Sequence, residues 1–207
     1  MNILDAQSKN DAQKENAAQA MPLIDKIIED SGALDCTGLV ELYGAKYNQN
    51  PDDTGEFEKL TANSFDAITL WHVLEHVHDL SSYVQQLKLL LKEKGKLFIA
   101  VPNYTSLDAK IYKEYWAAYD VPRHLYHFSP RSMQVLMEKN GLKIIEHKPM
   151  WYDSFYISVL SNKYKSGKNK WTAALWNGFR SNLKAMSNVK KCSSVIYIVC
   201  PQFSKGV

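Results

Sequence analysis

The chain has 207 residues, enough for one ordinary α/β domain, and 45% of them are hydrophobic. No run approaches the roughly 20 apolar residues that a membrane-spanning helix needs, and the first residues lack the basic and apolar segments of a secretory signal. The three cysteines form no C-x-x-C pair, which argues against a disulfide framework or a thiolate zinc site and predicts a cytoplasmic protein.

The net charge of +3 conceals an uneven distribution. Residues 1–60 hold 12 Asp and Glu against 5 Lys and Arg, whereas no acidic residue follows Asp153. A basic C-terminal region with aromatic residues is typical of proteins that meet an anionic substrate, nucleic acid or an acidic membrane surface. A solvated lysine-rich surface is the simpler interpretation, and we do not expect a nucleic-acid partner.

The N-terminal part has the weaker secondary-structure signals. Residues 1–20 are polar and predict a flexible arm. Residues 21–32 predict a short amphipathic helix that begins near Pro22 and ends at Gly32.

From Ser64 the pattern sharpens into a strand, a helix and a strand. Residues 65–71 form an apolar run that is long enough for one buried strand. A helix is expected over 81–95, capped by Ser81 or Ser82 and ended by Gly95, followed by a strand over 96–103. This order is the βαβ unit of a parallel sheet.

The C-terminal half predicts further helices and strands. A helix is expected over 129–141, with Ser129 as its cap and Pro130 in its first turn, and a strand over 142–151. Another helix over 170–188 precedes a last strand over 193–200. We therefore predict a single α/β domain over 21–207, in which 151–192 is a long insertion on the substrate side.

The first candidate site is the stretch "WHVLEHV", which follows the strand at 65–71. Its "HVLEH" matches the H-x-x-E-H zinc signature, but that signature needs a continuous helix, and no N-cap residue separates the strand from His72. The alternatives are a ligand site at the strand end, lined by Trp71 and His72, and a structural turn held by Glu75 and His76. We favour the strand-end site for Trp71 and His72 and a structural role for Glu75 and His76.

The second candidate site is "PRHLYHFS", a loop before the helix at 129–141. Arg123, His124, Tyr126 and His127 lie within five residues, and loops rich in such side chains commonly carry function. An aromatic latch over the sheet is the structural alternative.

Together, "NSFDAITLWHVLEHVHDL", "LKLLLKEKGKLFIAVPN" and "YDVPRHLYHFSPRSMQVLMEKNGLKIIE" resemble class I S-adenosylmethionine-dependent methyltransferases. The resemblance covers about residues 61–160. It implies a Rossmann-like sheet of seven strands, mostly parallel with a reversed last strand, and S-adenosylmethionine as the cofactor. We expect a methyltransferase that acts on a small-molecule, lipid or saccharide acceptor; the alternative is a non-catalytic scaffold that binds an anionic partner through its basic C-terminal region.

The resemblance also implies roles for single residues. Leu70, Trp71 and His72 would contact the cofactor, and Arg123, Tyr126 and His127 would bind the substrate. His72 and His124 are the candidate bases, because imidazole titrates near neutral pH. In related enzymes a Glu-His pair binds a divalent metal, and the resemblance maps that pair to Glu75 and His76, with His124 as an optional third ligand. Since His72 replaces another acid of those enzymes, we predict no metal ligands here.

The N-terminal part departs from the family. The G-x-G-x-G loop that approaches the cofactor has no match, and the nearest candidate is Gly32 to Gly44, with Val40 where a second glycine would allow close approach. We therefore expect a sheet that is incomplete in its N-terminal half and weak cofactor binding. A second copy of the chain is one way to cover the sheet edge that missing strands would expose.

Overall fold

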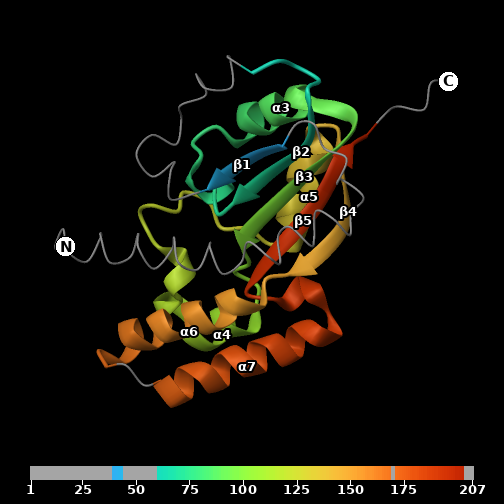
Figure 1. Cartoon of the computed structure of the whole chain (residues 1–207). Helices are drawn as coiled ribbons and strands as arrows, with labels where there is room; N and C mark the ends of the chain where they lie inside the picture. The colour runs from blue at the N-terminus through green and yellow to red at the C-terminus, as the bar shows by residue number, and fades with distance from the viewer. Residues whose placement is uncertain (1–38, 44–59, 169–170, 203–207) are drawn as a thin grey trace.

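The computed structural model describes residues 39–43, 60–168 and 171–202 (Figure 1). The predicted arm at 1–20, the helix at 21–32 and the part of the glycine-loop candidate before Leu39 lie outside these residues.

A mixed sheet organises the described part of the chain (Figure 1). Its five strands stand in the order β1-β2-β3-β5-β4. Strands β1, β2 and β3 are parallel, and β5 runs antiparallel to both of its neighbours. This confirms the predicted sheet with a reversed last strand, although the described residues supply five strands and the family resemblance implied seven. The strands are β1 (Leu39–Tyr43), β2 (Phe65–Trp71), β3 (Leu91–Pro102), β4 (Leu142–Pro149) and β5 (Ser194–Pro201).

Strand β1 corrects one reading of the glycine-loop candidate. Leu39–Tyr43 pairs with β2 in register, from Leu39 opposite Ala67 to Tyr43 opposite Trp71. Val40 therefore lies inside a strand and not at a loop position that could approach a cofactor.

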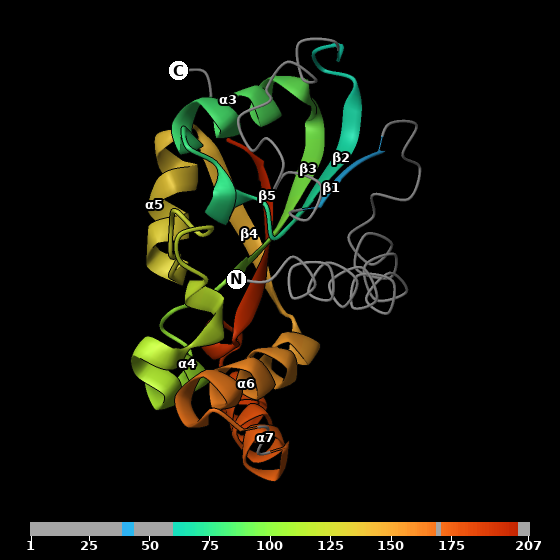
Figure 2. The ribbon, with the colours of Figure 1, turned by 90° about the vertical axis from the view of Figure 1, so that its left-hand side faces the viewer.

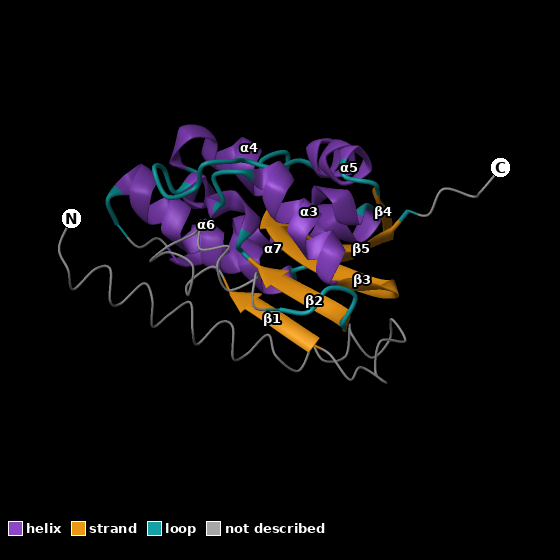
Figure 3. Cartoon of the chain, turned by 90° about the horizontal axis from the view of Figure 1, so that it is seen from above, coloured by secondary structure: helices purple, strands orange, loops and turns teal. Residues whose placement is uncertain are grey.

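Helices cover one face and one end of this sheet. In Figures 2 and 3, α3 and α5 lie along one face, and α4, α6 and α7 gather beyond the end where β4 finishes and β5 begins. Short 3-10 turns connect them. The helices are α3 (Leu80–Leu90), α4 (Leu107–Tyr112), α5 (Pro130–Lys139), α6 (Trp151–Ser166) and α7 (Trp171–Ser187); the turns are η2 (Leu74–His76), η3 (Lys113–Tyr115), η4 (Ala117–Tyr119) and η5 (Val189–Lys191).

The predicted helix at 81–95 is too long at its C-terminal end. Helix α3 stops at Leu90, and Leu91 already pairs with Phe65 in the sheet. Gly95 is thus a strand residue and not a helix stop: a Cβ there would lie 2.9 Å from the Phe65 carbonyl oxygen. The N-cap also differs, because Asp79 accepts the Ser82 amide in place of the predicted serines.

Helix α5 follows its prediction closely. Ser129 and Ser132 form a reciprocal capping box, and Pro130 occupies the first turn. Met133 and Met137 are fully buried against the sheet.

The insertion at 151–192 consists of α6, α7 and η5. A small second core ties α6 to the segment after β3, where Ile157 packs with Ala109, Tyr112 and Trp116. Among the described helices, none is long and apolar enough to cross a bilayer. Because Asp153 of α6 contacts His72, the insertion lies at the end of the sheet where the β2–η2 junction is (Figure 1).

Candidate functional site

The "WHVLEHV" stretch forms a strand-to-turn junction. Strand β2 ends at Trp71, His72 adopts a left-handed backbone with φ of 54°, and the single 3-10 turn η2 carries Glu75 and His76. A non-glycine residue in this region is uncommon and is favoured at functional sites. The continuous helix that an H-x-x-E-H zinc site needs is not formed here, as the sequence predicted.

His72 lies between two carboxylates. Its Nδ1 is 3.1 Å from Glu75 Oε1, and its Nε2 is 3.1 Å from Asp153 Oδ2. Burial alone would lower the pKa of His72, but Asp153 and Glu75 outweigh burial and raise the pKa to about 10. The imidazole is therefore a cation at neutral pH, which disfavours it as a proton acceptor.

Glu75 is a buried, ionised carboxylate. Its side chain is 1% exposed, and its Oε2 has no hydrogen-bond partner among the described residues. Burial would raise the pKa of Glu75, but the hydrogen bond and positive charge of His72 lower it. A buried anionic oxygen without a donor is costly, so Oε2 is suited to meet a cation or a donor from a bound molecule.

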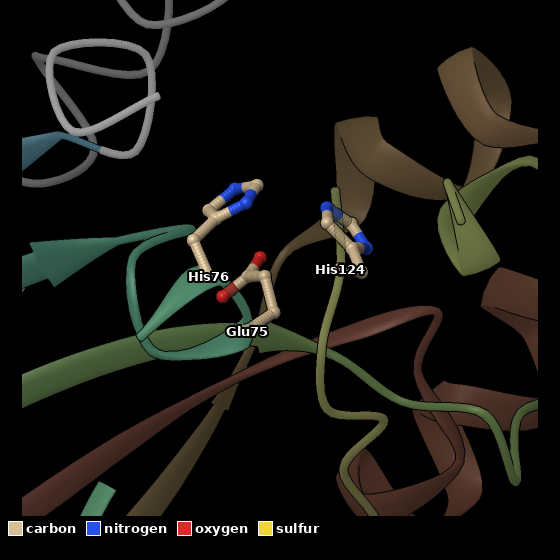
Figure 4. A group of neighbouring side chains, drawn as sticks. All are labelled: Glu75, His76 and His124. Atoms are coloured by element: carbon tan, nitrogen blue, oxygen red, sulfur yellow. The ribbon is translucent and has the colours of Figure 1, made fainter. Parts of the chain in front are cut away.

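Two further histidines face this carboxylate from different segments (Figure 4). His76 Nδ1 lies 3.0 Å from the Arg123 carbonyl oxygen, and His124 Nδ1 lies 2.8 Å from the Ala118 carbonyl oxygen. Because a carbonyl only accepts, each Nδ1 must carry the hydrogen, which leaves each Nε2 with a lone pair in the neutral ring. Burial lowers the pKa of His124, partly offset by the charge of Glu75, so its neutral form is favoured.

Glu75, His76 and His124 together form a possible ligand set. One donor atom from each lies within 4.8 Å of the others, and the two rings meet edge to face at 4.8 Å. Outer hydrogen bonds of this kind fix the ring orientation of metal-bound histidines. The three side chains could thus hold a small cation, and the absence of metal ligands that the sequence predicted stays a prediction.

The predicted substrate residues of the "PRHLYHFS" loop each have an internal partner. Arg123 pairs with Asp120, Tyr126 donates to the His78 carbonyl at 2.8 Å, and the His127 ring packs against Tyr119. These contacts fit the structural latch, and substrate binding by the three residues stays a prediction. Only His124 of this loop enters the Glu75 cluster.

The predicted cofactor residues at the end of β2 are enclosed. Leu70 is fully buried, and Trp71 is 4% exposed with its indole donating to Thr69 Oγ1 at 3.0 Å. Neither side chain offers an open face for stacking. If this strand end meets a cofactor, its backbone and His72 are the groups that can do so.

Asp153 is the site residue that sequence reasoning missed. It lies in the first turn of α6, 81 positions after His72 (153 minus 72), and joins the site only through the fold. The sequence carries no local signal for it, whereas the adjacency of Glu75 and His76 was visible in "LEH".

Similarity to characterised proteins is partial. The chain is 33% identical over 107 residues to the mitochondrial ubiquinone biosynthesis O-methyltransferase of Homo sapiens, which covers 48% of this chain and 29% of that protein. The ubiquinone biosynthesis O-methyltransferase of Xanthomonas axonopodis pv. citri is 31% identical over 99 residues, which covers 44% and 41%. The matched part of the chain thus spans less than half of each relative's length.

The fold has solved counterparts. A protein from Galdieria sulphuraria, assigned as a sarcosine dimethylglycine methyltransferase, superposes with a TM-score of 0.53 at 12% identity, covering 90% of this chain and 86% of that one. At this identity the likeness shows the fold alone. The family model described as "Methyltransferase domain" matches residues 8–147, and it supports S-adenosylmethionine as the cofactor. By this match over more than half of its length, the chain belongs to the methyltransferase-domain family.

Proposed function

We propose that this protein transfers a methyl group from S-adenosylmethionine to a hydroxyl group of a small molecule. The observation that carries the proposal is the cluster of Glu75, His76 and His124 beside the end of β2, within a chain of the methyltransferase-domain family. The O-methyltransferase activity in the names of the curated relatives supports a hydroxyl acceptor.

The charge states of His124 and His72 suit them to different roles in methyl transfer. A sulfonium cofactor supplies an electrophilic methyl group, and the acceptor oxygen must lose its proton as it attacks. The neutral His124 Nε2 is the candidate to take that proton, because the pKa of His124 is lowered while its Nδ1 is held by Ala118. His72, predicted as the other base, serves in this proposal as the cation that fixes Glu75.

The same donor set fits a divalent cation. Glu75 Oε2, which has no hydrogen-bond partner among the described residues, would supply a carboxylate oxygen, and His76 and His124 would supply two imidazole nitrogens. Zinc and similar ions accept such a set of ligands. A cation held by Glu75, His76 and His124 would lower the pKa of an acceptor hydroxyl and replace the need for a protein base. Metal removal decides between this role and His124 as the direct base.

The insertion at 151–192 is proposed to shape the acceptor site. Asp153 in α6 contacts His72, and the second core joins α6 to η4, whose neighbour Asp120 begins the loop that carries His124. A substitution at Asp153 of α6 is therefore expected to affect Glu75 through His72, which contacts both residues.

Cofactor binding and methyl transfer are tested on the full chain. Calorimetry with S-adenosylmethionine measures binding, and transfer of a labelled methyl group to catechol-type acceptors measures activity. Glu75→Gln preserves shape and removes charge, and we expect it to lower transfer by at least about tenfold, as loss of a positioned acid-base or metal group does. Saturating cofactor with no transfer to any hydroxyl acceptor would refute the O-methyl assignment.

Metal binding is tested separately. Titration of the chelator-treated protein with Zn²⁺ or Mn²⁺ should show one site that His76→Ala and His124→Ala weaken. His127→Ala is the matched control, since His127 lies on the same loop outside the cluster. If all three variants bind the metal ion with the same affinity, the cluster does not hold a metal, and His124 remains the proposed base.

A further inference from the structure

Helix α7 buries small side chains and exposes large apolar ones, whereas an ordinary surface helix buries its large apolar side chains. Its buried positions are Ala174, Gly178, Ser181 and Ala185. This small face packs closely on α6: a Cβ on Gly178 would lie 2.8 Å from Phe155 Cδ1 and 3.1 Å from the Ser154 carbonyl oxygen. Helix α7 therefore packs on α6 through close contact of the two backbones, and its large apolar side chains face away from α6.

The outer side of α7 carries an apolar stripe. At about 100° per residue, its members fall within roughly 140° of the helix circumference. Met186 is 74% exposed, Trp176 60% and Trp171 57%, which is far beyond what core packing of a helix would leave. The stripe consists of Trp171, Leu175, Trp176, Phe179, Leu183 and Met186.

The surroundings of the stripe are positively charged. Arg180 and Lys184 are exposed on α7 and follow the stripe on the side of Trp176. Lys163, Lys165 and Lys168 are exposed around the tip of the α6–α7 hairpin. No acidic residue follows Asp153 in the chain, so no carboxylate of this hairpin beyond that position offsets these charges.

We propose that the outer face of α7 docks on the surface of an anionic lipid bilayer. Trp, Phe and Leu on one face with Lys and Arg at its side is the pattern of helices that lie in the membrane interface. The helix lies on the bilayer and does not cross it, since no described helix is long and apolar enough to span one. Figures 1 and 2 place α7 outermost at its end of the molecule, where a flat surface can reach it.

Charge favours this occupant over the alternatives. A second copy of the chain would bring one cationic hairpin against another, and like charges oppose that contact. Nucleic acid would satisfy the lysines but leave Leu175, Leu183 and Met186 without a hydrocarbon environment. An anionic bilayer supplies phosphate charge and acyl chains together.

Cosedimentation of the full chain with vesicles tests the proposal. We expect binding to vesicles of phosphatidylcholine with about 30% phosphatidylglycerol, whose negative surface potential attracts Lys and Arg side chains, and little binding to pure phosphatidylcholine. Trp176→Ser with Phe179→Ser should reduce the partition coefficient by at least about tenfold, because two large apolar side chains no longer insert. Arg180→Glu with Lys184→Glu should do the same at low salt.

The controls separate docking from unfolding. Leu89→Ser removes an apolar side chain that is 64% exposed on α3, at the other end of the molecule, and should leave partitioning unchanged. Brominated lipid should quench Trp171 and Trp176 and spare the buried Trp71 and Trp116. Thermal unfolding of the α7 variants should match that of the parent chain.

Other outcomes would overturn the proposal. If Trp176→Ser with Phe179→Ser leaves vesicle binding intact, the binding is a general effect of charge and not of the apolar stripe. Absence of binding together with a dimer that Trp176→Ser dissociates would assign the stripe to a second copy. Tight, salt-sensitive binding to RNA with no affinity for vesicles would assign the lysines to nucleic acid.

Discussion

At the scale of single residues, partners set the chemistry of each ionisable group. His72 sits between Glu75 and Asp153 and is held as a cation, while His124, enclosed and bound to a carbonyl, is favoured as a neutral ring. Two histidines predicted for the same role thus become different chemical groups, and composition alone does not distinguish them.

The contact between His72 and Asp153 is a positioning interaction whose loss has a measurable effect. Asp153→Asn keeps the shape but removes the charge, and we expect a loss of about 1.5–3 kcal/mol in the free energy of unfolding, the range for a hydrogen bond to a charged group. Urea denaturation measures it. Glu146→Gln, at an exposed ion pair with Lys148, is the control and should stay within about 0.5 kcal/mol.

Cys192 is predicted to react slowly with alkylating agents. Burial raises the pKa of its thiol to about 11, so at pH 8 only a minute fraction is thiolate, the reactive form. Peptide mapping after iodoacetamide treatment at pH 8 should show label at the half-buried Cys200 before Cys192. In denaturant the two cysteines should be labelled at similar rates. Rapid labelling of Cys192 in the folded chain would contradict the prediction that burial protects its thiol.

At the scale of elements, close contact between α6 and α7 is what holds the insertion together. Gly178 faces Phe155 with no room for a side chain, so Gly178→Val forces the helices apart. We expect a cost of about 1–3 kcal/mol from overpacking, read as a lower melting temperature.

Ala173→Val is the matched control for that helix. Ala173 is exposed on α7, so the change carries only the smaller helix-propensity cost of a β-branched residue. If the two variants melt at the same temperature, the tight α6–α7 contact does not limit stability.

At the scale of the whole molecule, one buried carboxylate joins three segments. Asp108 in α4 is fully buried and accepts from Trp116 Nε1 at 2.8 Å, Ser181 Oγ at 2.7 Å and Ser193 Oγ at 2.6 Å. It thus connects the segment after β3 to α7 and to the start of β5.

Asp108→Asn should destabilise the chain as a unit. The asparagine oxygen would face Trp116 and Ser193 and its NH2 group would face the Ser181 hydroxyl, so neutral hydrogen bonds would replace bonds to a charged acceptor at a cost of about 1–3 kcal/mol. Urea unfolding followed by tryptophan fluorescence and by circular dichroism should shift together. Glu114→Gln, an exposed change nearby, should leave both curves in place.

Elements whose limits are set locally were predictable. Helix α5 carries its own cap, its proline and its buried methionines within ten residues, and the structure matches the prediction. Helix α3 was extended wrongly past Leu90, because the pairing of Leu91 with Phe65 outweighs the helical preference of the lysine-rich segment that follows.

The sequence by itself determined the βαβ order and the adjacency of Glu75 and His76, and its resemblance to class I methyltransferases implied the reversed strand and the family. Caps, apolar periodicity and neighbouring motif residues all act over a few positions, so they can be read along the chain. Only the tertiary structure decided that His124 joins that pair, that Asp153 holds His72, and that α7 turns its large apolar residues outward. Each of these depends on contacts between segments far apart in the chain, which no local pattern encodes.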